Sequence, residues 1–167
     1  MTQLDKLETT LDDSLNKKAP FKLPESSRKS LAGALWWLAL VGGLAQLYLA
    51  WRLWSDWHRV DQLVDYANSI ADDLGPFFYL VLITLAVSGA LLLLAAPSLK
   101  AMKKAGWNLI FYSLLVNVAY GVVSLFSDYG GFSNLFGALL GSLVGAYLLF
   151  QVRDHFMKSH HTAGHKA

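Results

Sequence analysis

The sequence lacks cysteine altogether and is poor in charge. Without a thiol among its 167 residues, it cannot form a disulfide-stapled secreted module, a cysteine-ligated zinc or iron–sulfur site, or a thiol nucleophile. Charged residues make up 16% of the chain, against about 25% in soluble domains. Hydrophobic residues make up 54%, which excludes an intrinsically disordered chain.

Reactive constellations are absent from the sequence as well. It contains no Ser-His-Asp arrangement, no phosphate-binding loop and no pair of carboxylates within an apolar run, so the common hydrolytic, nucleotide-dependent and proton-relay chemistries have no candidate residues. No basic patch interleaved with aromatic residues indicates nucleic-acid binding. We therefore expect a protein that is not an enzyme and that has no cofactor, no bound metal and no nucleic-acid partner.

Four long windows carry no Asp, Glu, Lys or Arg. They comprise 22, 26, 23 and 24 residues, at 30–51, 74–99, 105–127 and 129–152. A helix rises about 1.5 Å per residue, so about 20 residues cross a hydrocarbon layer of about 30 Å. Each helix of a soluble bundle would need a polar stripe along one side. The four consecutive leucines at 91–94 make that part of the chain apolar on every side of a helix. The windows predict an all-α integral membrane protein with four transmembrane helices.

These windows divide the chain into three parts. We expect a cytoplasmic N-terminal segment at 1–29 with a short amphipathic helix, a transmembrane domain at 30–152, and a cytoplasmic tail at 153–167. The predicted spans lie at about 31–54, 77–96, 107–126 and 133–152. Between the first two spans we expect an extracytoplasmic amphipathic helix at 56–74.

The distribution of Lys and Arg predicts the orientation in the membrane. Twelve of the fourteen lie before the first span, between the second and third spans, or after the fourth, whereas the other connections hold only Arg52 and Arg59. Cytoplasmic loops carry the excess of basic residues. Both termini are therefore expected in the cytoplasm, and the net charge of +2 averages a basic inner surface with an acidic outer one.

Two segments outside the spans have the hydrophobic spacing of amphipathic helices. In the N-terminal segment, Leu4, Leu7, Leu11 and Leu15 recur every three or four residues; this helix either docks on a membrane or partner, or folds back on its own bundle. In the outer connection, a 3-4-3-4-3 spacing gives an apolar face that consists of Trp57, Val60, Val64, Ala67, Ala71 and Leu74. We expect Gly75 and Pro76 to end that helix. Its apolar face either lies against lipid or the bundle, or holds a partner.

The fourth span carries Gly137, Gly141 and Gly145 at intervals of four residues. Such glycines form a groove into which a second helix can pack closely. The groove serves either packing inside one chain or pairing between chains. Besides the lipid bilayer, a second copy of the chain or another membrane protein is therefore a candidate partner.

A polar stripe follows the third span with a 4-3-4 spacing and consists of Ser113, Asn117, Tyr120 and Ser124. These groups either line a water-filled path or join helices by hydrogen bonds worth about 0.6 kcal/mol each. Polar side chains of the other spans that can meet the stripe are Gln46, Thr84, Ser88 and Ser142. The tail adds His155, His160, His161 and His165, which lack the carboxylate-rich surroundings of a metal site and lie in a tail that is expected to be loose.

The run LDDSLNKKAP at 11–20, the step Lys22-Leu23-Pro24 before a Trp-rich first span, and the run VDYANS at 64–69 resemble small uncharacterised four-span membrane proteins of candidate-phylum bacteria with reduced genomes. The resemblance implies a bacterial cytoplasmic membrane and assigns no activity. We expect a non-enzymatic membrane protein that acts by helix association with itself or a partner. The alternative is a small channel or carrier for a neutral or weakly polar solute.

Overall fold

Helices account for all regular structure in the described residues, which in this computed structural model are 3–17, 21–61, 68–126 and 131–157. The chain begins with α1 (Gln3–Asp12) and a π-helical turn, η1 (Asp13–Lys17). Four long helices follow: α2 (Glu25–Asp61), α3 (Asn68–Lys100), α4 (Lys104–Ser124) and α5 (Gly131–Gln151). The short α6 (Arg153–Met157) ends the described part of the chain.

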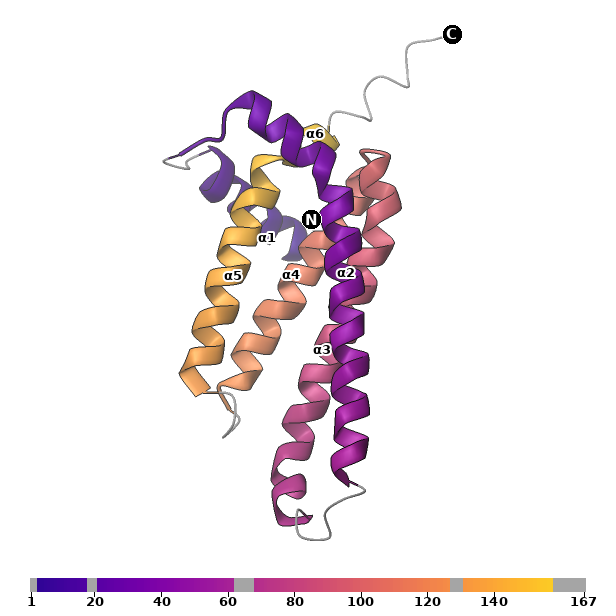
Figure 1. The fold of residues 1–167 in the computed structure, drawn as a ribbon. Helices are drawn as coiled ribbons and strands as arrows, with labels where there is room; N and C mark the ends of the chain where they lie inside the picture. The colour runs from indigo at the N-terminus through magenta and orange to yellow at the C-terminus, as the bar shows by residue number, and fades with distance from the viewer. Residues whose placement is uncertain (1–2, 18–20, 62–67, 127–130, 158–167) are drawn as a thin grey trace.

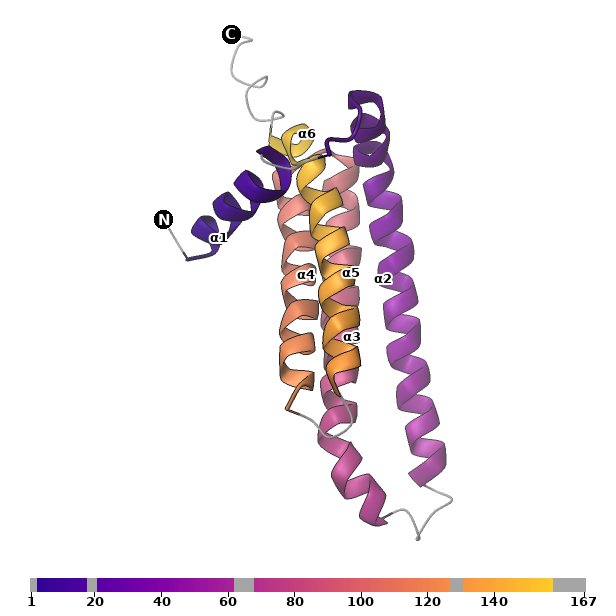
Figure 2. The same ribbon diagram turned by 90° about the vertical axis from the view of Figure 1, so that its left-hand side faces the viewer.

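The long helices pack in the order in which they occur in the sequence. α2 packs on α3, α3 on α4, and α4 on α5, whereas α2 and α5 scarcely touch and form the two edges of the arrangement (Figures 1 and 2). α1 and η1 lie outside the long helices, at the end where α6 is found, which we call the α6 end. At the opposite end, α2 and α3 extend beyond α4 and α5 (Figure 1).

The apolar side chains of these helices point mostly outward. Three helical stretches are long and apolar enough to cross a membrane: Glu25–Trp57, Phe77–Lys100 and Lys104–Ser124. Only 17%, 17% and 33% of their most apolar windows are buried within the molecule. Because a soluble protein would cover such surface, the chain is a multi-pass membrane protein.

The fourth predicted span is not confirmed. α5 has 21 residues, which is enough to cross a hydrocarbon layer. The part of α5 whose side chains are all described, Leu139–Gln151, is apolar but by itself shorter than a span. The predicted spans at 31–54 and 77–96 fall inside α2 and α3, whereas those at 107–126 and 133–152 end one or two residues beyond α4 and α5.

The outer connection departs from the predicted helix at 56–74. Residues 56–61 are the last turns of α2 and 68–74 the first turns of α3, while 62–67 lie outside the described residues. The predicted stop is wrong, because α3 runs through Gly75 and Pro76. α2 contains no proline that would end it at the membrane surface. Near water, solvent can replace the hydrogen bond that Pro76 removes.

The predicted apolar face of that helix is therefore divided between two elements. The Trp57 ring stacks on that of Phe78 in α3, with the ring centres 4.5 Å apart. Val60 belongs to α2, and Ala71 and Leu74 to α3, but their side chains lie outside those described. The remaining two positions fall in the undescribed stretch 62–67: Val64 and Ala67. A separate amphipathic helix is not confirmed.

A close approach between α2 and α3 depends on glycines that the sequence patterns did not single out. A Cβ atom at Gly43 would lie 2.9 Å from the Gly89 carbonyl oxygen and from Leu93 Cγ. Beside this contact, Ser88 Oγ lies 2.7 Å from Gln46 Oε1 and 2.7 Å from the Thr84 carbonyl oxygen, and its single proton is shared between these two acceptors. Backbone proximity and an interhelical hydrogen bond thus join the two helices.

Replacing Gly43 by alanine is expected to destabilise the α2–α3 pair. The added methyl group must displace backbone or Leu93, at a cost of about 1–3 kcal/mol, measured by detergent-induced unfolding followed by circular dichroism. Gly33→Ala is the matched control because a Cβ there meets nothing within 4 Å in the described chain; it should leave the stability unchanged or raise it by up to about 1 kcal/mol, since alanine favours a helix more than glycine does. Equal stability of the two variants would contradict the contact.

Candidate functional site

The turn between α3 and α4 places a tryptophan in the protein interior. Met102 has a positive φ of 51°, and its N–H donates to the Leu99 carbonyl at 2.9 Å. A Cβ at Gly106 would lie 2.6 Å from the Leu99 nitrogen, so only glycine lets α4 begin this close to α3. The next residue, Trp107, is fully buried.

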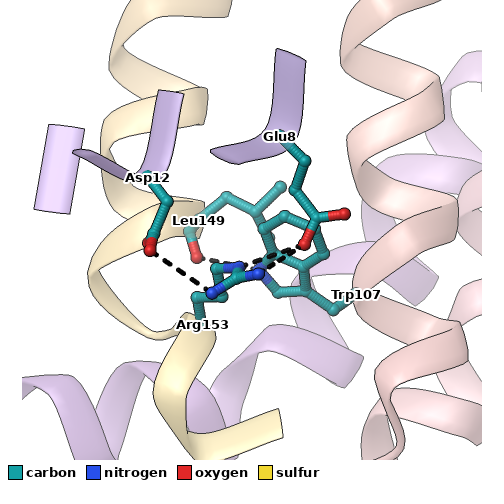
Figure 3. A network of polar contacts seen from close by, with 5 residues as sticks. All are labelled: Glu8, Asp12, Trp107, Leu149 and Arg153. Carbon is teal, nitrogen blue, oxygen red and sulfur yellow. Dashed lines mark hydrogen bonds and ion pairs between the residues drawn. The ribbon is translucent and has the colours of Figure 1, made fainter. Parts of the chain in front are cut away.

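Arg153, just beyond α5, is the centre of a polar cluster that encloses this tryptophan (Figure 3). Its Nη2 donates to Glu8 Oε1 at 2.6 Å, and its Nη1 lies 3.4 Å from Asp12 Oδ2. The guanidinium carbon is 5.6 Å from the centre of the Trp107 ring, whose Nε1 donates to the Leu149 carbonyl at 3.0 Å. We call these five residues the Arg153 cluster; charge-assisted bonds of this kind are about twice as strong as neutral ones.

The cluster fixes α1 because Glu8 and Asp12 stand one turn apart on it. The Arg153 side chain is 21% exposed, and those of Glu8 and Asp12 are 15% and 10% exposed. Water therefore screens these ion pairs less than it screens surface pairs. α1 is thereby held against the ends of α4 and α5.

Gln151 and Tyr147 bind the rest of the N-terminal segment to α5. Gln151 Nε2 donates to the Leu15 carbonyl at 3.2 Å, and its Oε1 accepts from the Leu23 N–H at 3.4 Å. The Tyr147 hydroxyl donates to the Phe21 carbonyl. Leu15 also packs against the core, as does Leu11. Of the two alternatives for the leucine-patterned segment, the described contacts are those of a helix folded back on its own bundle.

The sequence patterns did not predict the Arg153 cluster. The pattern that could have indicated it is the pair of carboxylates Glu8 and Asp12 on the flank of the leucine stripe, together with an arginine directly after the last apolar window. Of the tail histidines, only His155 is described. Its Nε2 lies 3.5 Å from Glu25 Oε1. His160, His161 and His165 lie outside the described residues.

The polar stripe of α4 makes contacts mainly within its own helix. Asn117 Nδ2 donates to the Ser113 carbonyl at 2.8 Å, and the Ser124 hydroxyl donates to the Gly121 carbonyl at 2.9 Å. The Tyr120 ring lies near that of Phe77 in α3. The described hydrogen bonds of the other polar side chains do not converge on the stripe, since Gln46 and Ser88 bind each other across α2 and α3.

The three glycines that follow one another at intervals of four residues in α5, Gly137, Gly141 and Gly145, have different surroundings. A Cβ at Gly145 would lie 3.1 Å from Leu114 Cδ2 of α4, so this glycine permits packing inside the chain. A Cβ at Gly137 or Gly141 would meet nothing within 4 Å in the described part of the chain. Gly145 thus serves the packing of one chain, while the other two remain open.

A cavity of about 210 Å³ separates the edge helices α2 and α5, and we call it the α2–α5 slot. Its walls include Leu38 of α2, Leu114 of α4, and Gly145 and Leu148 of α5. At about 100° per residue, Gly141 and Gly137 point within about 20° of Leu148. The open glycines therefore continue the α5 wall of this slot toward the far end of the helix.

Comparisons of the chain with protein-family models, with curated proteins and with solved structures find no match in any of the three. Support for a function therefore comes from the described contacts and surfaces of this chain.

Arg153→Gln is expected to loosen α1. Loss of the charge-assisted bonds should remove about 2 kcal/mol, which corresponds to about thirtyfold faster amide hydrogen exchange in residues 3–12. Arg52→Gln is the control, since Arg52 lies 3.7 Å from Asp56 in an exposed pair and should alter exchange in α1 by less than about twofold. Unchanged exchange in the Arg153 variant would refute the anchoring role.

Proposed function

We propose that this protein is a non-enzymatic integral membrane protein of the bacterial cytoplasmic membrane that works by association of its transmembrane helices. Its first partner is a second copy of the same chain. In this proposal α5 crosses the bilayer as the fourth span, both termini are cytoplasmic, and the α6 end faces the cytoplasm. The surplus of basic residues at that end supports the orientation.

The observation that carries the proposal is the open glycine face of α5 beside the α2–α5 slot. Gly137 and Gly141 meet nothing in the described chain, whereas Gly43, Gly106 and Gly145 lie against neighbouring atoms. Glycines occur where backbones approach closely. The unfilled pair supports an approach by a helix from outside the chain.

A second copy fits this face because a glycine groove is complementary to itself. In a two-fold dimer the same surface is used on both subunits, so each α5 places its glycines against the other. Lipid tails are as apolar as leucine, so hydrophobic burial does not drive this contact; dispersion contacts and weak backbone hydrogen bonds do. Exposed Val144 and Leu140 flank the glycines and widen the contact.

The alternative, a channel or carrier for a neutral solute, gains no support from the described contacts. Its candidate residues were Ser113, Asn117, Tyr120 and Ser124. The Asn117 amide and the Ser124 hydroxyl donate to backbone carbonyls of α4, as packing groups do. None of the four residues lines the α2–α5 slot.

Single-cysteine labelling is expected to give a four-span topology. Because the chain has no cysteine, each introduced thiol reports one position. A membrane-impermeant maleimide added to intact cells should label Asp56→Cys and Phe126→Cys but not Lys103→Cys or Lys166→Cys, which should react only after permeabilisation. External labelling of Lys166→Cys together with Phe126→Cys would show that α5 does not cross the bilayer.

Gly141→Leu is expected to weaken self-association. A Cβ at this position meets nothing within 4 Å in the described part of the chain, whereas a leucine blocks close approach of a second helix. The dissociation constant of the dimer should therefore rise at least about tenfold. Single-molecule photobleaching in lipid vesicles at graded protein density measures this constant. Gly33→Leu is the control, because Gly33 is also open but lies on the side of α2 opposite Leu35 and the slot. A monomeric wild type, or a variant that pairs normally, would overturn the self-association.

A further inference from the structure

An apolar groove of about 360 Å³ lies between the N-terminal segment and the helices α4 and α5. We call it the α1 groove. Leu7 and Leu11 of α1 form one wall, and Phe111, Leu115 and Val118 of α4 form the floor. Its volume is within the range of small-molecule sites, which starts at about 300 Å³.

The groove is open along its α5 side. Leu139 and Leu143, which form that side, are 42% and 56% exposed. Because they belong to the apolar stretch of α5, their exposed surface faces hydrocarbon wherever α5 lies in the bilayer. The molecules that reach this opening first are therefore lipid acyl chains.

The groove is closed at the α6 end. There η1 packs on α5, with the Leu15 carbonyl bound by Gln151, and the Arg153 cluster holds Glu8 and Asp12 across the helix ends (Figure 3). A transmembrane helix of another molecule needs a groove that is open at both ends. A flexible acyl chain that enters from the side and ends near the interface needs only the side opening.

Charge at the closed end favours an anionic headgroup. Lys103 is the last residue of the turn before α4, and Lys104 is the first residue of α4. Neither lysine forms an ion pair within the described residues. Lys104 stands seven residues before Phe111 and so on the same face of α4 as the floor. Glu8 and Asp12, the nearby carboxylates of α1, are engaged by Arg153. Lysines near the interface strengthen the binding of anionic lipid.

We propose that the α1 groove binds one acyl chain of an anionic phospholipid, whose headgroup lies beside Lys104 at the α6 end. The N-terminal segment then acts as one wall of a lipid site. This site rests on the proposed position of α5 in the bilayer, but it is separate from the glycine face, so loss of lipid binding and loss of self-association can be told apart.

Native mass spectrometry with added phosphatidylglycerol or phosphatidylcholine tests the site. The wild type should retain one phosphatidylglycerol in preference to phosphatidylcholine. Val118→Trp fills the floor and should weaken retention about tenfold, whereas Val122→Trp, one turn further along α4 and exposed, should not. Lys104→Gln should reduce the preference between the two lipids. Equal retention of both lipids by the wild type, or normal retention by Val118→Trp, overturns the proposal.

A measurement on the wild-type chain avoids any effect of substitution on folding. Phosphatidylglycerol with a photoreactive diazirine in its acyl chain should cross-link mainly to Leu115, Leu139 and Leu143. Adducts spread evenly over exposed positions of α3, such as Ile83 and Val87, would mean that the groove holds no particular lipid and would overturn the proposal.

Discussion

The structure depends on one constraint, that hydrocarbon offers no hydrogen bonds to the backbone and no reward for hiding apolar side chains. Helices satisfy the first condition internally. The second leaves most of the apolar surface of α2 and α3 directed outward and removes the force that packs soluble helices together. Attraction between helices must then come from close contact and from polar groups. Gly43 against Gly89, Ser88 against Gln46, and Trp107 against the Leu149 carbonyl are contacts of these two kinds.

The strongest polar interactions are concentrated at the α6 end, and this distribution has a physical reason. Charged side chains are costly at the centre of a bilayer but tolerable near its surface. Arg153, Glu8 and Asp12 therefore stand where α1 can cross the helix ends, and their ion pairs gain from partial burial. Deeper in the bundle, the Ser88 hydroxyl and the Gln46 side-chain amide join two helices by a weaker hydrogen bond. The stronger ion pairs thus lie at the helix ends, and the weaker hydrogen bonds lie deeper along the helices.

The three long apolar helices could be predicted from the sequence because the length and lack of charge that suit a helix to the bilayer are local properties of the chain. The outer connection was predicted less well, since Gly75 and Pro76 end helices in water-soluble contexts but are accommodated inside α3. The repeated glycines of α5 were visible, yet their division between Gly145 and the open pair depends on how α4 lies beside them. The Arg153 cluster could not be read from local spacing, because Glu8 and Arg153 are 145 residues apart.

That separation orders events during biosynthesis. α1 leaves the ribosome before the Arg153 guanidinium that binds Glu8 and Asp12 and before the Gln151 amide that binds the Leu15 carbonyl. Until α5 has been inserted, Glu8 and Asp12 cannot pair with Arg153, and long-range contacts of this kind form late. α1 consequently takes its described position only after α5 has been inserted.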